Sequence, residues 1–287
     1  AAKGVILATG GFDWAPDYMP AHFPGVELIG APRDNTGDGQ RMAEAVGAEL
    51  AHMDQANIAP VTFTQYEGHR HAQPLYETYA AHCILVNRHG QRFVSEGSPA
   101  LGSALDERGP DGKPKHLPVW RIFDARYSHK LSAMYAAKDP DFVRSAPTLE
   151  ALAAKIGLDP ATLVATVRRF NGWAAEGVDR DFHRGEIAWE RYYTGPVEQK
   201  KALGTIEQAP FHAAPFLYAS LGTKGGPRTS ARCEVLRPDR SVIAGLYCAG
   251  IAMAHPIGTK AVGAGTTIGP CLTFGYIAGR AVTRRNT

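Results

Sequence analysis

The stretch GTKAVGAGTTIG near the end of this 287-residue chain contains the residue types that could hold a ligand. Gly263, Gly265 and Gly269 would let the backbone come close to a bound group where an apolar helix begins. Helix-start N–H groups and the helix dipole favour negative charge there, such as a phosphate or an enolate. A tight loop packed under a helix would explain the same glycines, so both interpretations stay open.

Two other glycine-rich segments lie near the start of the chain. The apolar run at 3–8 predicts a buried strand, and Thr9, Gly10 and Gly11 would turn the backbone at its end. In NTGDG, the Asp38 carboxylate could accept hydrogen bonds from the hydroxyls of a ligand. A helix cap is the simpler explanation of Asp38, because acidic residues are favoured where helices begin.

Cationic side chains in the glycine loops are a further source of chemistry. Lys224, His255 and Lys260 could contact developing charge, although each could equally be a solvated side chain. The eleven histidines show no HxxxH or HExxH spacing, so we predict no metal site. Hydrolysis and phosphoryl transfer lack their usual signatures, since there is no GxSxG turn and no Walker loop.

The composition is typical of a globular protein that binds a small molecule. The net charge is only +3 and there is no Lys/Arg run, which argues against a nucleic-acid or membrane-surface partner. No apolar run reaches the ~18 residues of a membrane-spanning helix. The four cysteines are widely spaced, and we expect reduced thiols and a cytoplasmic location.

The elements that must position these residues fall into two groups. Hydrophobic spacing predicts a helix that starts around 35–38 and ends near Gly47, and glycine loops alternating with short strands in the C-terminal region before a final helix. Between these regions we expect a hairpin turning at 88–90, a helix over 149–156 capped by Thr148, and a helix opened by Asp159 and Pro160. We therefore predict one domain from 1–57 and 214–287, and a second from 58–213.

Seven segments resemble, in order, the flavoprotein family of 3-ketosteroid 1-dehydrogenases and soluble fumarate reductases. They are KGVILATGGFDW, NTGDGQRMAEAVGAEL, VNRHGQRFVSE, DFHRGEIAWERYY, LGTKGGPRTSARCEVL, GLYCAG and GAGTTIGPCLTFGYIAGR. The resemblance implies an α/β fold, in which part of a Rossmann-like FAD-binding domain is interrupted by an α+β substrate cap. The family's N-terminal GxGxxG segment has no counterpart here, so we expect an incomplete flavoprotein chain.

The resemblance also implies which residues form the site. Gly265 falls where ketosteroid enzymes polarise the substrate carbonyl with a backbone N–H. The residues implied to bind FAD lie in the matching glycine-rich motifs: Thr9, Gly10, Gly11, Asp38, Thr223, Gly250, Ile251, Thr266 and Thr267.

Four departures from the family motifs affect the expected chemistry. Ala261 and Val262 stand where the ketosteroid branch has its catalytic Tyr-Pro, and the fumarate reductases have an arginine at the Ala261 position. Alanine or glycine also replaces the other fumarate-reductase residues, at Ala59, Ala100 and Gly222. Lys260, next to the vacant tyrosine position, is a candidate substitute.

Three functional hypotheses follow. The first is an FAD-dependent oxidoreductase acting on a CH–CH bond next to a carbonyl, with a small hydrophobic or steroid-like carbonyl substrate suggested by the apolar, aromatic cap. The second is a non-catalytic or partner-requiring fragment, whose missing N-terminal segment is supplied by a second chain. The third is a fumarate-reductase-like enoate reductase.

Overall fold

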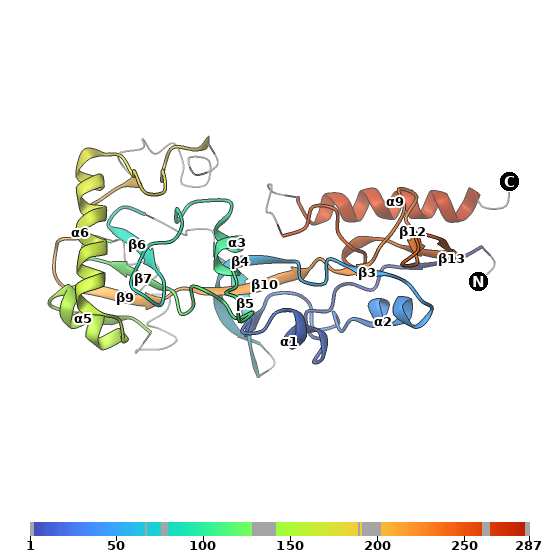
Figure 1. The fold of residues 1–287 in the computed structure, drawn as a ribbon, viewed down its shortest axis with the longest axis horizontal. Helices are drawn as coiled ribbons and strands as arrows, with labels where there is room; N and C mark the ends of the chain where they lie inside the picture. Colours follow the sequence, from blue (N-terminus) through green and yellow to red (C-terminus); the bar gives the residue numbers. More distant parts are fainter. Residues whose placement is uncertain are drawn as a thin grey trace. The chain divides into compact units, whose positions relative to one another are not determined.

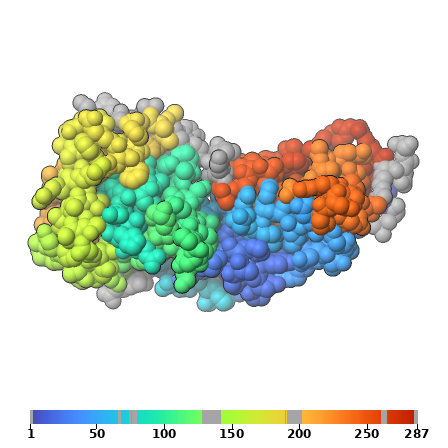
Figure 2. Space-filling view, in the orientation of Figure 1, coloured from blue at the N-terminus to red at the C-terminus, as the bar shows by residue number. Residues whose placement is uncertain are grey.

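The computed structural model describes residues 3–66, 68–75, 80–127, 142–188, 190, 202–259 and 265–284. They belong to two compact units, one formed by 1–74 and 218–287 and the other by 75–217 (Figure 1). In the space-filling view, the blue N-terminal atoms pack with the orange and red C-terminal atoms within the first unit (Figure 2). The mixed α/β class with an interrupted first domain is as expected.

The boundaries of the units differ from those expected at 57 and 214. The structure places them after Pro74 and before Tyr218. The reason is strand pairing: β4 (Ala56–Tyr66) and β5 (His69–Pro74) form an antiparallel hairpin, and β5 also pairs with β2 (Leu28–Ile29). The hairpin therefore belongs to the first unit, although the aromatic and histidine-rich composition there had indicated the second.

The first unit contains a three-stranded sheet between two helices. Strand β13 (Val242–Cys248) pairs in parallel with β1 (Val5–Leu7) and antiparallel with β12 (Glu234–Leu236). Tyr247 packs with Ala278 of helix α9 (Ile268–Arg284), whereas Cys248 packs with Ala43 of helix α2 (Asp38–Ala45). Successive residues of a strand point to opposite faces, so each helix covers one face of the sheet (Figure 1).

The expected strand at 3–8 is present, but the prediction that it is buried is wrong. Val5 is 47% exposed and Ile6 is 37% exposed, and only Leu7 of the three strand residues is buried. In the described residues β1 lies at the end of its sheet order, β1-β13-β12. An edge strand has a neighbour on one side only, so apolar composition does not ensure burial.

The remaining strands of the first unit lead toward the glycine loops. Strand β10 (Leu217–Thr223) pairs in parallel with β2, which pairs with the β4–β5 hairpin. The short β11 (Gly226–Pro227) pairs with β3 (Leu50–Ala51). Two short helical segments complete the unit, α1 (Tyr18–His22) and the 3₁₀ turn η1 (Gly250–Ala252).

The second unit contains, among its described residues, an antiparallel sheet and three helices, two of which pack against the sheet. Its strand order is β6 (Cys83–Val86), β7 (Trp120–Phe123), β9 (Phe211–Pro215) and β8 (Arg144–Ala146). The helices are α3 (Leu101–Leu105), α5 (Leu149–Ile156) and α6 (Pro160–Glu176). The core joins the sheet to α5 and α6 through Ile84, Ile122, Ala213, Leu152, Leu163, Val167 and Phe170.

The caps of α5 and α6 are confirmed. Thr148 Oγ1 accepts a hydrogen bond from Ala151 N at 3.1 Å, and Asp159 Oδ2 accepts one from Thr162 N at 2.8 Å. Such caps satisfy N–H groups that have no acceptor within the helix. In the part of the chain that the structure describes, no helix has the length and apolarity needed to cross a membrane.

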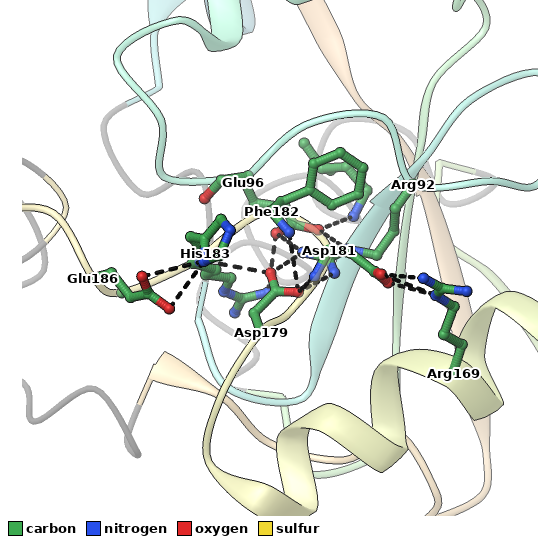
Figure 3. Close-up of polar contacts among 12 residues, drawn as sticks. Arg92, Glu96, Arg169, Asp179, Asp181, Phe182, His183 and Glu186 are labelled. Carbon is green, nitrogen blue, oxygen red and sulfur yellow. Dashed lines mark hydrogen bonds and ion pairs between the residues drawn. The ribbon is translucent and has the colours of Figure 1, made fainter.

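The hairpin expected after β6 is only partly correct. The chain turns at Gly90, which has φ 74°, but 91–96 forms no strand, and β6 pairs with β7 instead. Arg92 and Glu96 enter an ion-pair network with Asp179, with N–O distances of 2.9 Å and 2.8 Å (Figure 3). The alternation of residue types over 91–96 had predicted a strand, but the side chains of Arg92 and Glu96 form this network instead.

The network is fully enclosed. The side chains of Glu96, Asp179 and Arg184 are 0% exposed, and Arg184 Nη1 lies 3.3 Å from Glu96 Oε2. Burial alone would raise the pKa of the Glu96 carboxyl, but Arg92 and Arg184 hold that pKa below its usual range. Each buried charge therefore depends on its partners, because an unpaired charge in the interior is strongly unfavourable.

Candidate cofactor site

The first glycine turn lies directly after β1. Gly10 has φ 81°, in the left-handed region that favours glycine. A Cβ built on Gly11 would lie 2.3 Å from Thr223 Oγ1 and 3.2 Å from Ile251 Cγ2. The fold thus brings together three of the predicted site residues, from the ends of β1, β10 and β13, and leaves no room for a side chain at position 11.

Asp13 holds this turn against the end of β10. It is 0% exposed, and its Oδ1 accepts hydrogen bonds from Ser220 Oγ at 2.6 Å and from Thr223 N at 3.1 Å. Phe12 N in turn donates to Thr223 Oγ1 at 2.9 Å. The sequence analysis missed Asp13, although an acidic residue two positions after a Gly-Gly turn was an available signal.

Gln40 joins three of the site's loops. This residue is 0% exposed, and its Nε2 lies within 3.3 to 3.4 Å of three carbonyl oxygens, those of Gly10, Gly225 and Ala252. Sequence reasoning also missed Gln40, which reads as an ordinary polar residue in the first turn of a helix. A buried side-chain amide rigidifies the segments that it bridges because each lost bond would leave a carbonyl unsatisfied.

Asp38 begins α2 but does not cap it. The N-cap is Gly37, with φ 82° and no side-chain cap, and its N–H donates to Gly11 O at 3.1 Å. The Asp38 side chain is 62% exposed and accepts a hydrogen bond from Thr36 Oγ1 at 3.1 Å. The helix-cap interpretation is therefore wrong. The carboxylate also lies 3.7 Å from Arg41 Nη1 and is accessible to solvent.

Thr9, directly before the glycine pair, contacts the start of α2. It packs against α2, since a Cβ on Gly39 would be 2.2 Å from Thr9 Oγ1. Because neither Gly11 nor Gly39 has a side chain, the turn after β1 can approach both the start of α2 and the end of β10. These glycines thus let three backbone segments of the first unit meet.

The first turn of α9 forms the second part of the site. Gly265 has φ 85°, and no atom of the described residues lies within 4 Å of a Cβ built on it. Thr267 is contacted by Lys224, whose Nζ lies 3.3 Å from Thr267 Oγ1. Lys260, Ala261 and Val262 lie outside the described residues, so the proposed substitute for the tyrosine is not placed.

His255 and Lys224 are buried beside each other. Each is 1% exposed, and His255 N donates to Lys224 O at 2.8 Å. Ile257 N donates to His255 Nδ1 at 3.2 Å, which places the imidazole proton on Nε2. Burial, followed by the nearby charge of Lys224, lowers the pKa of His255 to about 4, so the ring is neutral at pH 7.

These residues fit an anionic ligand. Gly10, Gly250 and Gly265 have left-handed φ values of 81°, 75° and 85°, where a glycine backbone can come close to a ligand. Lys224 and the start of α9 provide positive charge, and His255 Nε2 is a buried donor with no acceptor among the described residues. The phosphates and ring edge of FAD have the matching properties.

Comparisons with known proteins agree with this fit. 4-Oxocyclohexanecarboxylate 2-dehydrogenase of Sinomonas cyclohexanicum is 36% identical over 296 residues, covering 98% of this chain and 51% of the relative. 3-Oxosteroid 1-dehydrogenase of Mycobacterium tuberculosis is 38% identical over 302 residues, covering 97% and 52%. The chain spans about half the length of the curated relatives it matches.

A solved structure and a family model extend the comparison. The crystal structure of 3-ketosteroid delta1-dehydrogenase from Sterolibacterium denitrificans with 1,4-androstadiene-3,17-dione matches with a TM-score of 0.84 and 32% identity, covering 98% of this chain and 53% of that one. Residues 1–268 match the model described as FAD binding domain. The chain therefore belongs to the FAD-binding domain family, and FAD as its cofactor is confirmed.

Proposed function

We propose that this chain is part of an FAD-dependent oxidoreductase that acts on a CH–CH bond next to a ketone carbonyl in a ring-bearing substrate. The observation that carries the proposal is Gly265, just before α9, which combines a left-handed φ of 85° with no atom of the described residues within 4 Å of its Cβ position. Two relatives with at least 36% identity are named as dehydrogenases of ring ketones, which supports the same class.

Gly265 would act on the carbonyl oxygen of the substrate. A backbone N–H at a helix start can donate to an oxygen on which negative charge develops, and the helix dipole strengthens the interaction. A side chain at this position would occupy the open space and be strained by the left-handed φ. Bound FAD supplies the redox chemistry, by exchanging a hydride with the carbon β to the carbonyl.

The other site residues would bind the cofactor. Gly10, Gly11 and Thr9 suit the diphosphate because their backbone turn admits close approach, and the exposed Asp38 carboxylate suits ligand hydroxyls. The remaining cofactor contacts that we propose come from the ends of β10 and β13 and from the start of α9, at Thr223, Gly250, Ile251, Thr266 and Thr267. Lys260 remains a proposed proton carrier.

Ring ketones are favoured over a small dicarboxylate. The fumarate-reductase residues implied by the resemblance are replaced by Ala59, Ala100, Gly222 and Ala261, which carry no charge. Both named relatives act on oxo-substituted rings. Steroids and oxocyclohexane derivatives are therefore the substrates that we propose, and enoate reduction ranks behind them.

A single-polypeptide enzyme is favoured over one completed by a second chain, because the aligned region of each relative is about half of one polypeptide. We also propose a cytoplasmic location, since the four cysteines are free thiols in the structure.

The test is spectroscopic. The full natural polypeptide containing this chain is purified and its absorption spectrum is recorded, then a 3-oxosteroid, 4-oxocyclohexanecarboxylate or succinate is added without oxygen. We expect flavin bands that bleach with one of the two ring ketones and not with succinate. Bleaching by succinate alone would favour the fumarate-reductase class, and a protein that takes up no FAD would contradict the proposal.

A further inference from the structure

Lys224 is a buried cation with no carboxylate within ion-pair distance among the described residues, although the Asp13 carboxylate acts on its charge from farther away. Its side chain is among the largest fully buried ones, and the residue is 1% exposed. The only side-chain hydrogen bond of its Nζ to the described residues goes to Thr267 Oγ1, at 3.3 Å. An ammonium group has three donor protons, so two of them have no acceptor in this part of the chain.

The surroundings make this arrangement unfavourable for a protein without a ligand. An unpaired charge in the interior is costly, and burial lowers the pKa of Lys224 in consequence. The contacted Thr267 directly precedes α9, at the end of the helix where the dipole is also positive. Lysine at this position is explained if an anion is bound there in the working protein.

A second buried donor next to Lys224 has no acceptor among the described residues. His255 Nε2 is buried and carries the imidazole proton, because Nδ1 accepts from Ile257 N. The backbone N of His255 donates to Lys224 O, which places the two residues side by side. A buried cation with a single side-chain hydrogen bond and a buried neutral donor without an acceptor, both among the described residues, indicate a site for an oxygen-rich anion.

We propose that Lys224 is the counter-cation of the reduced flavin ring and thereby raises the reduction potential of bound FAD. This inference rests on the proposed function. A hydride taken from the ketone substrate carries two electrons and one proton to the flavin, and leaves one negative charge on the N1–C2=O edge of the ring. Lys224 stabilises that charge from its position at Thr267. The oxidised ring is neutral, so the stabilisation favours the reduced form.

The experiment uses the full FAD-loaded polypeptide with Lys224→Met, which removes the charge but keeps a long side chain. Lys224→Arg retains the charge, and Lys155→Met is the control at an exposed lysine of the second unit. Two quantities are measured, the affinity for sulfite and the flavin reduction potential. Sulfite adds to flavin N5 and leaves the same negative charge on the ring, so it reports the stabilisation without substrate.

We expect Lys224→Met to weaken sulfite binding about tenfold or more and to lower the potential by about 30 mV for each tenfold change. Lys224→Arg and Lys155→Met should stay close to wild type. An unchanged potential and sulfite affinity in Lys224→Met would overturn the inference. An equal loss of affinity for oxidised and reduced FAD in Lys224→Met would also overturn it, because that result would place Lys224 at the diphosphate.

Loss of FAD is also informative. If Lys224→Met loses FAD while Lys224→Arg keeps it, the requirement for a cation is supported. If both variants lose FAD, shape rather than charge explains the residue and the inference fails. A wild-type polypeptide that binds no FAD would contradict the proposed function itself, whereas an active wild type with an unchanged potential in Lys224→Met would overturn only this inference.

Discussion

The Asp13 carboxylate accepts a 2.6 Å hydrogen bond from Ser220 Oγ, across 207 positions of sequence. Asp13→Ala would leave the buried Ser220 hydroxyl and the Thr223 N–H without an acceptor. Each such group costs about 1–3 kcal/mol, so the variant should be less stable and bind FAD more weakly. Urea unfolding and FAD titration measure the two effects. Asp34→Ala, at an exposed position, is the control. Equal stability and equal FAD affinity of the two variants would contradict the role of Asp13 in holding the glycine turn against β10.

Gly11→Ala tests the close packing of the first glycine turn. The new methyl group would lie 2.3 Å from Thr223 Oγ1, which is closer than atoms can approach without movement. Overpacking of this kind costs about 1–3 kcal/mol and should displace Thr223 from the site. The matched control is Gly172→Ala in α6, where a Cβ meets nothing within 4 Å and helix propensity predicts a small gain in stability. Thermal unfolding should separate the two variants.

Gly265→Ala separates catalysis from cofactor binding. The left-handed φ of 85° makes a side chain unfavourable by roughly 1–2 kcal/mol, and the methyl group would enter the open space that we assign to the carbonyl. We expect a fall in kcat/KM of roughly tenfold or more, with the flavin spectrum retained. Gly279→Ala, further along α9, should keep wild-type kinetics. Wild-type turnover in Gly265→Ala would remove Gly265 from the mechanism.

Glu96→Gln tests the buried network of the second unit. Removing one charge leaves Arg92 and Arg184 incompletely paired, and breaking a buried pair costs about 3–5 kcal/mol. The comparison is Asp181→Asn, whose partner Arg169 is 66% exposed, so the expected loss is about 0–1 kcal/mol. Denaturant unfolding of both variants measures the difference. Similar losses of unfolding free energy in the two variants would show that burial does not determine how much these ion pairs stabilise the protein.

The buried His255 predicts a pH dependence of stability. Its pKa is about 4 in the folded chain, against an ordinary value of 6.5, so the unfolded chain binds more protons between these values. The unfolding free energy should therefore fall as the pH drops from about 6.5 to about 4. Below about pH 4, His255 should add no further pH dependence. His255→Gln should reduce this slope. An NMR titration of the ring that gives a midpoint near 6.5 would contradict the prediction.

The sequence by itself determined the features that depend on neighbouring residues. Thr148 and Asp159 cap their helices because a cap needs only N–H groups three residues away. The glycine turns after β1 and before α9 were equally visible, since left-handed φ values are a local property. The ordered motifs also identified the family and FAD, which the comparisons confirmed.

Tertiary structure decided which of these residues meet and which are buried. The structural roles of Asp13 and Gln40 depend on hydrogen-bond partners that lie 185 to 212 positions away, as in the contact of Gln40 with Ala252. Likewise, Arg92 followed a strand-like pattern but pairs with Asp179, 87 positions later. Burial and hydrogen-bond partners at such separations come from the packing of the whole unit. No local pattern showed that Lys224 would be enclosed without a carboxylate at ion-pair distance among the described residues.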